Sequence, residues 1–273
     1  MEFISFSHRF AEPIVNSDAL LLSRYNEFIN TLQNITDLDL AVDFINRKIE
    51  HRRRGTNFKS LTPSINRLIK ERLSSIPGWL SEVNIFNDTT GVLGNTEWRL
   101  DFACDNAFCV EIAFNHGEAI AWNLLKPVLA CELNHVQKAV QGKIGIYVCA
   151  TDDLKKAANI DSASGSFEKV LRYLPPMMNQ LTIPIMIIGL KPPINFFINR
   201  NANIVCKFFI PNFSNCNVMV RLNNGNPIQG TIIHYEEIPN LPFLNNIRVT
   251  IGIPGSQPMI IDQSEVKSIE YLI

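Results

Sequence analysis

The chain has 273 residues, 46% of them hydrophobic, so it can bury the core of one large domain, alone or with a small module. Its formal net charge of −1 excludes the overall basic composition of many nucleic-acid-binding proteins. No apolar run approaches the roughly 18 residues of a membrane span and no signal peptide opens the chain, so we expect a cytoplasmic protein without a membrane partner.

The first 60 residues are predicted to form helices joined by irregular links. Residues 19–32 have the apolar spacing of an amphipathic helix, and a second helix over residues 38–54 ends at Gly55. A third helix is predicted over residues 63–76, with a proline at its first position.

The segment from residue 47 to residue 72 is strongly basic. It holds nine Lys or Arg residues against two Glu, a net charge of +7, which leaves the remainder of the chain near −8. Such a patch is typical either of a DNA-binding surface or of an ordinary solvated helix face. If it binds DNA, Lys59, Arg67 and Lys70 are the candidate phosphate contacts.

Residues 98–114, WRLDFACDNAFCVEIAF, are predicted to form two apolar strands joined by a three-residue loop centred on Asn106. Asp101 and Glu111 are each five residues from that centre, so they face each other on one side of the hairpin. Two adjacent carboxylates repel unless a cation lies between them, and a divalent metal ion is the usual reason for such a pair. The alternative is a surface hairpin with two solvated acids.

Strands and helices alternate after the hairpin, which predicts an α/β sheet flanked by helices. The six cysteines show no metal-ligand spacing, and most are expected as buried free thiols in a reducing compartment. The predicted elements are a helix over 117–140 kinked at Pro127, a strand over 143–150, a short charged helix or loop over 152–158, a helix over 166–174 and a strand over 184–190.

The composition changes near the C-terminus. Residues 191–217 are rich in Pro and Asn, and only short strands are predicted from residue 218 onward. Five short strands with an Asn-Gly turn between the first two suggest a small closed barrel. We therefore predict a first domain over residues 1–213 and a second over residues 214–273.

The spacing of Asp101, Glu111 and Ala113 is that of a metal-dependent nuclease, apart from the last residue. Such a site needs an Asp, a Glu about ten residues later, and a Lys or substitute two residues after the Glu on the same strand face. The acids hold Mg²⁺, which polarises the scissile phosphate and activates water. Taken alone, this short pattern occurs by chance in many proteins.

The surrounding sequence resembles the BglII-like type II restriction endonucleases over roughly residues 60–190. The resemblance implies a PD-(D/E)XK nuclease core, Mg²⁺-dependent cleavage of duplex DNA, and a homodimer that acts on a palindrome, with GATC as a frequent element of the site. It makes Asp101 and Glu111 the metal carboxylates and Glu82 a further acid. The segments that carry it are IPGWLSEVNIF, WRLDF, VEIAFNHGEAIAWNLLK, GIYVCATDDLKK, SFEKVLRYL and IPIMIIGL.

Ala113 departs from that pattern, which has Lys in general and Gln in the BglII branch. Three explanations are open: the backbone and the metal ion suffice, a neighbour such as His116 or Glu118 substitutes, or the protein is inactive. His116 can equally be an ordinary loop residue.

The C-terminal segments VRLNNGNPIQGTIIHY, IRVTIGI and VKSIEYL resemble an Sm-like or SH3-like barrel, a module that binds nucleic acid or peptides or supports a dimer.

The sequence thus predicts a Mg²⁺-dependent, sequence-specific endonuclease. A catalytically inactive DNA- or RNA-binding protein, which uses the basic patch and the barrel, is the alternative that Ala113 favours. A structure-specific repair nuclease is a third hypothesis.

Overall fold

The computed structural model describes residues 1–87, 98–132, 137–211, 213–238 and 247–273. The chain divides into two compact units, which are described separately. The first comprises Met1–Ile35, Ile65–Lys156 and Ile160–Pro192, and the second Thr36–Ser64, Ala157–Asn159 and Pro193–Ile273. The fold is mixed α/β, as predicted.

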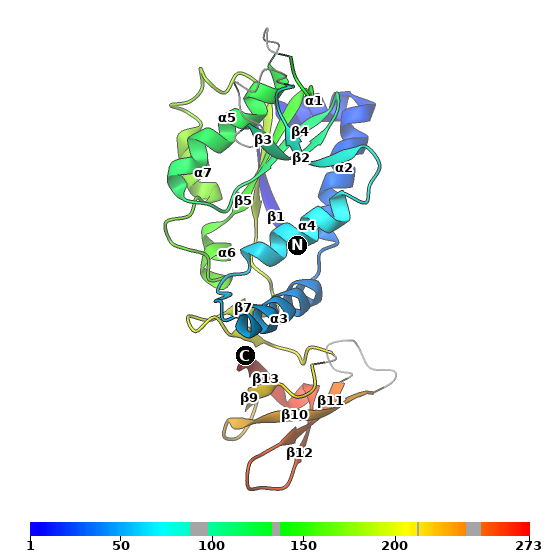
Figure 1. The fold of residues 1–273 in the computed structure, drawn as a ribbon, viewed down its shortest axis with the longest axis vertical. Helices are drawn as coiled ribbons and strands as arrows, with labels where there is room; N and C mark the ends of the chain where they lie inside the picture. The colour runs from blue at the N-terminus through cyan, green and yellow to red at the C-terminus, as the bar shows by residue number, and fades with distance from the viewer. Residues whose placement is uncertain (88–97, 133–136, 212, 239–246) are drawn as a thin grey trace. The chain divides into compact units, whose positions relative to one another are not determined.

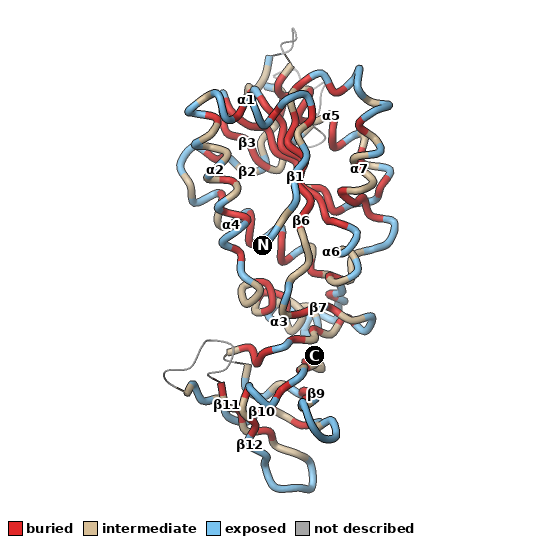
Figure 2. The backbone as a smooth tube through the Cα atoms, turned by 180° about the vertical axis from the view of Figure 1, so that it is seen from behind, coloured by how far each residue is buried: buried red, intermediate tan, exposed pale blue. Residues whose placement is uncertain are grey.

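A six-stranded sheet is the centre of the first unit (Figure 1). Its strand order is β1-β6-β5-β4-β3-β2. Strands β4, β5 and β6 are parallel, and the other three are antiparallel to their neighbours. Every residue of β5 and β6 is buried, as expected for parallel strands that helices cover on both faces (Figure 2). The strands are β1 (Phe3–His8), β2 (Trp79–Asn84), β3 (Arg99–Cys104), β4 (Phe108–Ile112), β5 (Ile144–Ala150) and β6 (Ile185–Leu190).

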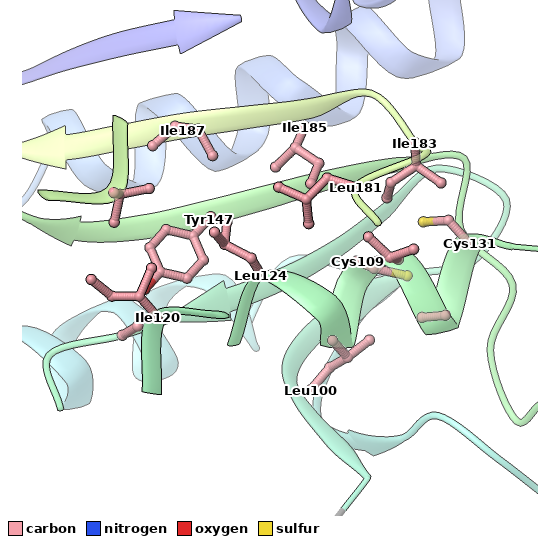
Figure 3. Close-up of a cluster of buried hydrophobic side chains, with 14 of the residues drawn as sticks. Leu100, Cys109, Ile120, Leu124, Cys131, Tyr147, Leu181, Ile183, Ile185 and Ile187 are labelled. Carbon is pink, nitrogen blue, oxygen red and sulfur yellow. The ribbon is translucent and has the colours of Figure 1, made fainter. Parts of the chain in front are cut away.

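Helices cover both faces of this sheet. On one face, the ring of Tyr25 from α2 and the ring of Trp79 both lie against Phe108. On the other face, α5 brings Leu124 over Tyr147, and the two belong to one continuous apolar cluster (Figure 3). Among the described residues, no helix is long and apolar enough to cross a membrane. The helices are α1 (Ala11–Ser17), α2 (Ala19–Gln33), α4 (Thr62–Leu73), α5 (Ile120–Cys131), α6 (Asp152–Ala157) and α7 (Phe167–Tyr173), with a 3₁₀ turn η1 at Gly117–Ala119.

Two predictions about secondary structure were wrong. Residues 1–60 are not only helical, because β1 pairs with β6 at the edge of the sheet. The predicted helix over 117–140 ends at Cys131, where Glu132 adopts an extended conformation. Downstream of it, Lys138 forms a β-bridge with Phe86, and the chain then enters β5. The predicted free thiols are confirmed, and five of the six cysteines are buried.

The second unit contains a helix and a seven-stranded sheet with the order β12-β11-β10-β9-β13-β8-β7. The adjacent pairs within this sheet are antiparallel. Strands β7 and β8 belong to it although they precede residue 214. The elements are α3 (Asp37–Arg53), β7 (Phe196–Ile198), β8 (Ile204–Cys206), β9 (Asn217–Leu222), β10 (Ile228–Glu237), β11 (Ile247–Gly252), β12 (Met259–Asp262), the 3₁₀ turn η2 (Gln263–Glu265) and β13 (Val266–Tyr271).

Candidate active site

The hairpin of β3 and β4 has the predicted loop and register. Asn106 takes the left-handed conformation with φ of 58°, which Asn tolerates better than most residues. The Asp105 side chain accepts a hydrogen bond from the Asn106 side-chain amide at 2.9 Å. Phe102 pairs with Val110 and Cys104 with Phe108, so the same register places Asp101 across from Glu111.

Asp101 and Glu111 lie at the open end of the hairpin, where Glu111 is buried and Asp101 is partly buried. Asp101 Oδ2 accepts a hydrogen bond of 2.6 Å from the backbone N–H of Ile112. Burial raises the pKa of Asp101, and the Ile112 N–H offsets part of that rise because it stabilises the ionised form. The alternative of two solvated acids is therefore wrong for this hairpin.

Glu111 is the more deeply buried of the two carboxylates, with only 4% of its surface exposed. Its Oε1 accepts a hydrogen bond of 2.6 Å from Lys126 Nζ, whereas its buried Oε2 has no hydrogen-bond partner among the described residues. Burial and the Asp101 charge raise the pKa of Glu111 to about 8, although Lys126 acts in the opposite direction. A buried, unsatisfied carboxylate oxygen is costly unless something binds to it.

Lys126 was not predicted as a site residue. It reaches Glu111 from α5, the helix that packs on β4 and β5. A signal for it was present, because Lys126 is the only charged residue of α5, whose residues are all described. The tertiary contact could not be inferred, since Lys126 and Glu111 are fifteen residues apart on different elements.

Glu82 lies across from Asp101 on the other neighbouring strand. The pairing of Ser81 with Phe102 and of Val83 with Leu100 places it there, and its negative charge contributes to the raised pKa of Asp101. Its own side chain forms ion pairs with Lys70 and with Arg99, and Lys70 is the main cause of its lowered pKa. The backbone φ of Glu82 is 55°, an unusual value for a residue within a strand.

His116 and Ala113 offer no polar group to the carboxylate pair in this conformation. His116 is exposed in the loop before η1, where it forms a β-bridge with Ser164, and within the described ranges no contact joins it to Asp101 or Glu111. Ala113 is 3% exposed and is part of the apolar cluster under α5.

The three predicted phosphate contacts lie in different environments. Arg67 pairs with Glu71 and Lys70 with Glu82, both in the first unit. Lys59 belongs to the second unit and lines a cavity of about 550 Å³ together with Lys48, Arg52 and Arg200. None of the described residues that line this cavity is Asp or Glu.

The carboxylate pair has the chemistry of a divalent-cation site. Mg²⁺ prefers oxygen ligands and is commonly held by one or two carboxylates, with water and phosphate oxygens completing its shell. Asp101 and Glu111 supply two such groups, and Glu111 Oε2 is an oxygen that a cation would satisfy. Among the described residues there is no group of three or more His, Cys, Asp or Glu side chains that could enclose a metal ion. The two carboxylates fit Mg²⁺, whose remaining ligands are water and phosphate oxygens.

Comparison with known proteins gives a family and a fold. The family model for restriction endonuclease BglII/BglIII matches residues 3–190. The fold is similar to the crystal structure of restriction endonuclease BglII complexed with a DNA 16-mer, with a TM-score of 0.51 and 14% sequence identity. That match covers 96% of this chain and 100% of the other, and at this identity it shows the fold alone. No curated protein matches the chain.

Proposed function

Because the chain belongs to the restriction endonuclease BglII/BglIII family, which makes it a type II site-specific deoxyribonuclease, we propose that it hydrolyses duplex DNA at the Asp101–Glu111 pair. The observation that carries this assignment is the directly opposed pair, in which Glu111 is buried and has one unsatisfied oxygen. The hairpin, the parallel strands and the covering helix α5 together would form the PD-(D/E)XK core.

The reaction that we propose joins the oxygen of a water molecule to phosphorus and breaks the bond from phosphorus to the leaving oxygen of the DNA strand. The water gives up a proton and the leaving oxygen takes one up, so no further reactant is needed. Asp101 and Glu111 would hold Mg²⁺, which supplies Lewis-acid polarisation of the phosphate and a more acidic water. Glu82, across from Asp101, is proposed to support the site electrostatically while Lys70 and Arg99 hold it.

A plasmid digest tests this function. The protein is incubated with supercoiled plasmid in Mg²⁺ or in EDTA, and the products are separated on a gel. Discrete, reproducible fragments that appear only with the divalent ion support the proposal. A gel shift without cleavage would instead support the inactive nucleic-acid-binding protein, and preferential cutting of branched DNA would support a repair nuclease.

A homodimer is the first consequence of this function. Cutting both strands of a palindrome with one site per subunit requires two-fold symmetry, because the symmetry of the site is matched by that of the protein. We expect light scattering to report twice the mass of the 30.9 kDa chain at micromolar concentration. A monomer both free and on DNA would contradict this expectation.

The basic residues give a second consequence. We expect Lys59→Ala to weaken binding to all DNA sequences alike and to lower the salt dependence by about one unit of slope, because one phosphate contact is lost. Arg67→Ala and Lys70→Ala should have smaller effects, since both cations are already paired with Glu. Fluorescence anisotropy over a salt series measures the slope.

A matched control for these variants is Lys156→Ala, because Lys156 is exposed and paired with Asp153 at 3.4 Å, outside the basic segment. If the slope for Lys59→Ala equals that of the control, the cavity around Lys59 is only solvated surface.

The C-terminal strands would form the proposed Sm-like or SH3-like barrel. The strand order β13-β9-β10-β11-β12 supports this proposal. In it β13, the last of the five strands in the sequence, pairs with β9, the first. We propose that residues 214–273 act in dimer packing or site selection, with residues 1–213 as the nuclease part. The proposed site is a palindrome that contains GATC.

A further inference from the structure

The position two residues after Glu111 cannot supply a positive charge. Residues two apart on an extended chain point to the same face, so a cation at position 113 would lie beside Glu111. Ala113 is there instead, and its methyl group is buried in the apolar cluster. Any protein cation beside the two carboxylates must therefore come from another element.

Lys126 on α5 is a cation that contacts Glu111 directly. Its Nζ lies 2.6 Å from Glu111 Oε1, and its side chain is only 16% exposed. Its positive charge also lowers the pKa of Asp101, so it acts on both carboxylates. Helix α5 holds it in place, because the neighbouring Leu124 and Val128 are buried against the sheet.

We propose that Lys126 is a catalytic residue, which contacts the scissile phosphate and replaces the cation that position 113 lacks. This inference rests on the proposed function. An ammonium group has three donors, and Glu111 takes one of them, so the others can reach a phosphate oxygen or the attacking water. In this role its ammonium group stabilises the negative charge that develops as water adds to phosphorus.

A purely structural lysine would also pair with Glu111, so the test must separate the two roles. Cleavage is measured under single-turnover conditions for Lys126→Met, which keeps length without charge, and for Lys126→Arg, which keeps the charge. Lys156→Met is the control, a lysine in an exposed ion pair of the same unit. Thermal unfolding in EDTA is recorded for each variant.

We expect Lys126→Met to reduce the cleavage rate about 100-fold or more, as the loss of one transition-state donor does. Lys126→Arg should recover part of that loss, and Lys156→Met should cut as the unmodified protein does. Cleavage by Lys126→Met within about threefold of the unmodified rate would overturn the proposal. The proposal would also be overturned if Lys126→Met failed to fold and Lys126→Arg restored folding but not cleavage.

A second measurement does not depend on turnover. After sequencing of fragment ends locates the scissile bond, binding in Ca²⁺ is compared for normal DNA and for DNA with an uncharged methylphosphonate at that position. The methylphosphonate should reduce the affinity of the unmodified protein several-fold more than that of Lys126→Met, because only the unmodified protein has a lysine charge to lose contact with. A double-mutant cycle gives the coupling free energy between Lys126 and this phosphate. Equal losses would mean that Lys126 does not touch the phosphate. A further outcome is that the unmodified protein cuts no DNA, while a methylphosphonate at one phosphate of the bound duplex still weakens its binding more than that of Lys126→Met. In that case the proposed reaction is wrong, but the contact between Lys126 and the phosphate is supported.

Discussion

Glu111→Gln and Asp101→Asn are expected to lower the single-turnover cleavage rate by about 1000-fold or more, because each removes a charged ligand of the proposed metal ion. Both substitutions preserve shape, and the amide oxygen that Glu111→Gln introduces can still accept the hydrogen bond from Lys126. DNA binding in EDTA should be largely unchanged, because neither substitution removes a positively charged phosphate contact. Quenched-flow cleavage and anisotropy measure the two effects.

Asp105→Asn is the matched control for these carboxylates. Asp105 lies in the same hairpin and is exposed, and in the described part of the chain its side chain accepts hydrogen bonds only from Asn106 and from the backbone of Gln141. It should cut within about threefold of the unmodified rate. If Glu111→Gln cuts as fast as Asp105→Asn, the carboxylate pair is not the active site.

Without divalent ions, the protein should lose stability as the pH rises from about 5 to about 9. The folded pKa of Glu111 is about 8 against an ordinary value of 4.5, so the folded state holds this proton more tightly than the unfolded state. The stabilisation is therefore fully present below pH 4.5 and is lost as the pH rises through 8. The shift corresponds to a loss on the order of 5 kcal/mol in the free energy of unfolding. Asp101 adds to it in the same direction, because its pKa is also raised.

Urea unfolding in EDTA and in Mg²⁺ at several pH values measures this effect. All three tryptophans lie in the first unit, so fluorescence follows the unfolding of the unit that holds the site. Mg²⁺ should restore stability at high pH, and Glu111→Gln should remove most of the pH dependence in EDTA. If the free energy of unfolding in EDTA stays constant or rises between about pH 5 and about pH 9, the pKa of Glu111 is not raised in the folded state.

The carboxylate hairpin could be predicted because its determinants are local. Alternation places Asp101 and Glu111 on one face, and an Asn at the centre of a short loop sets the register. The buried strands β5 and β6 were predictable for a similar reason, since both are continuous apolar runs.

Other features depend on contacts that no local pattern contains. β1 is short and half-exposed and becomes a strand because the edge of β6 is available to pair with it. Lys126 looks like an ordinary helix lysine until α5 is packed against β4. Glu82 was expected near the site, but its ion pairs with Lys70 and Arg99 join residues far apart in sequence.

Sequencing the ends of a plasmid digest, carried out in Mg²⁺ with the unmodified protein and Glu111→Gln in parallel, is the decisive measurement. The ends produced by the unmodified protein should all map to one short palindrome, cut symmetrically on the two strands, and Glu111→Gln should produce none above background. Ends scattered without a common sequence, or the same ends produced by Glu111→Gln, would contradict a site-specific nuclease that acts through this carboxylate pair.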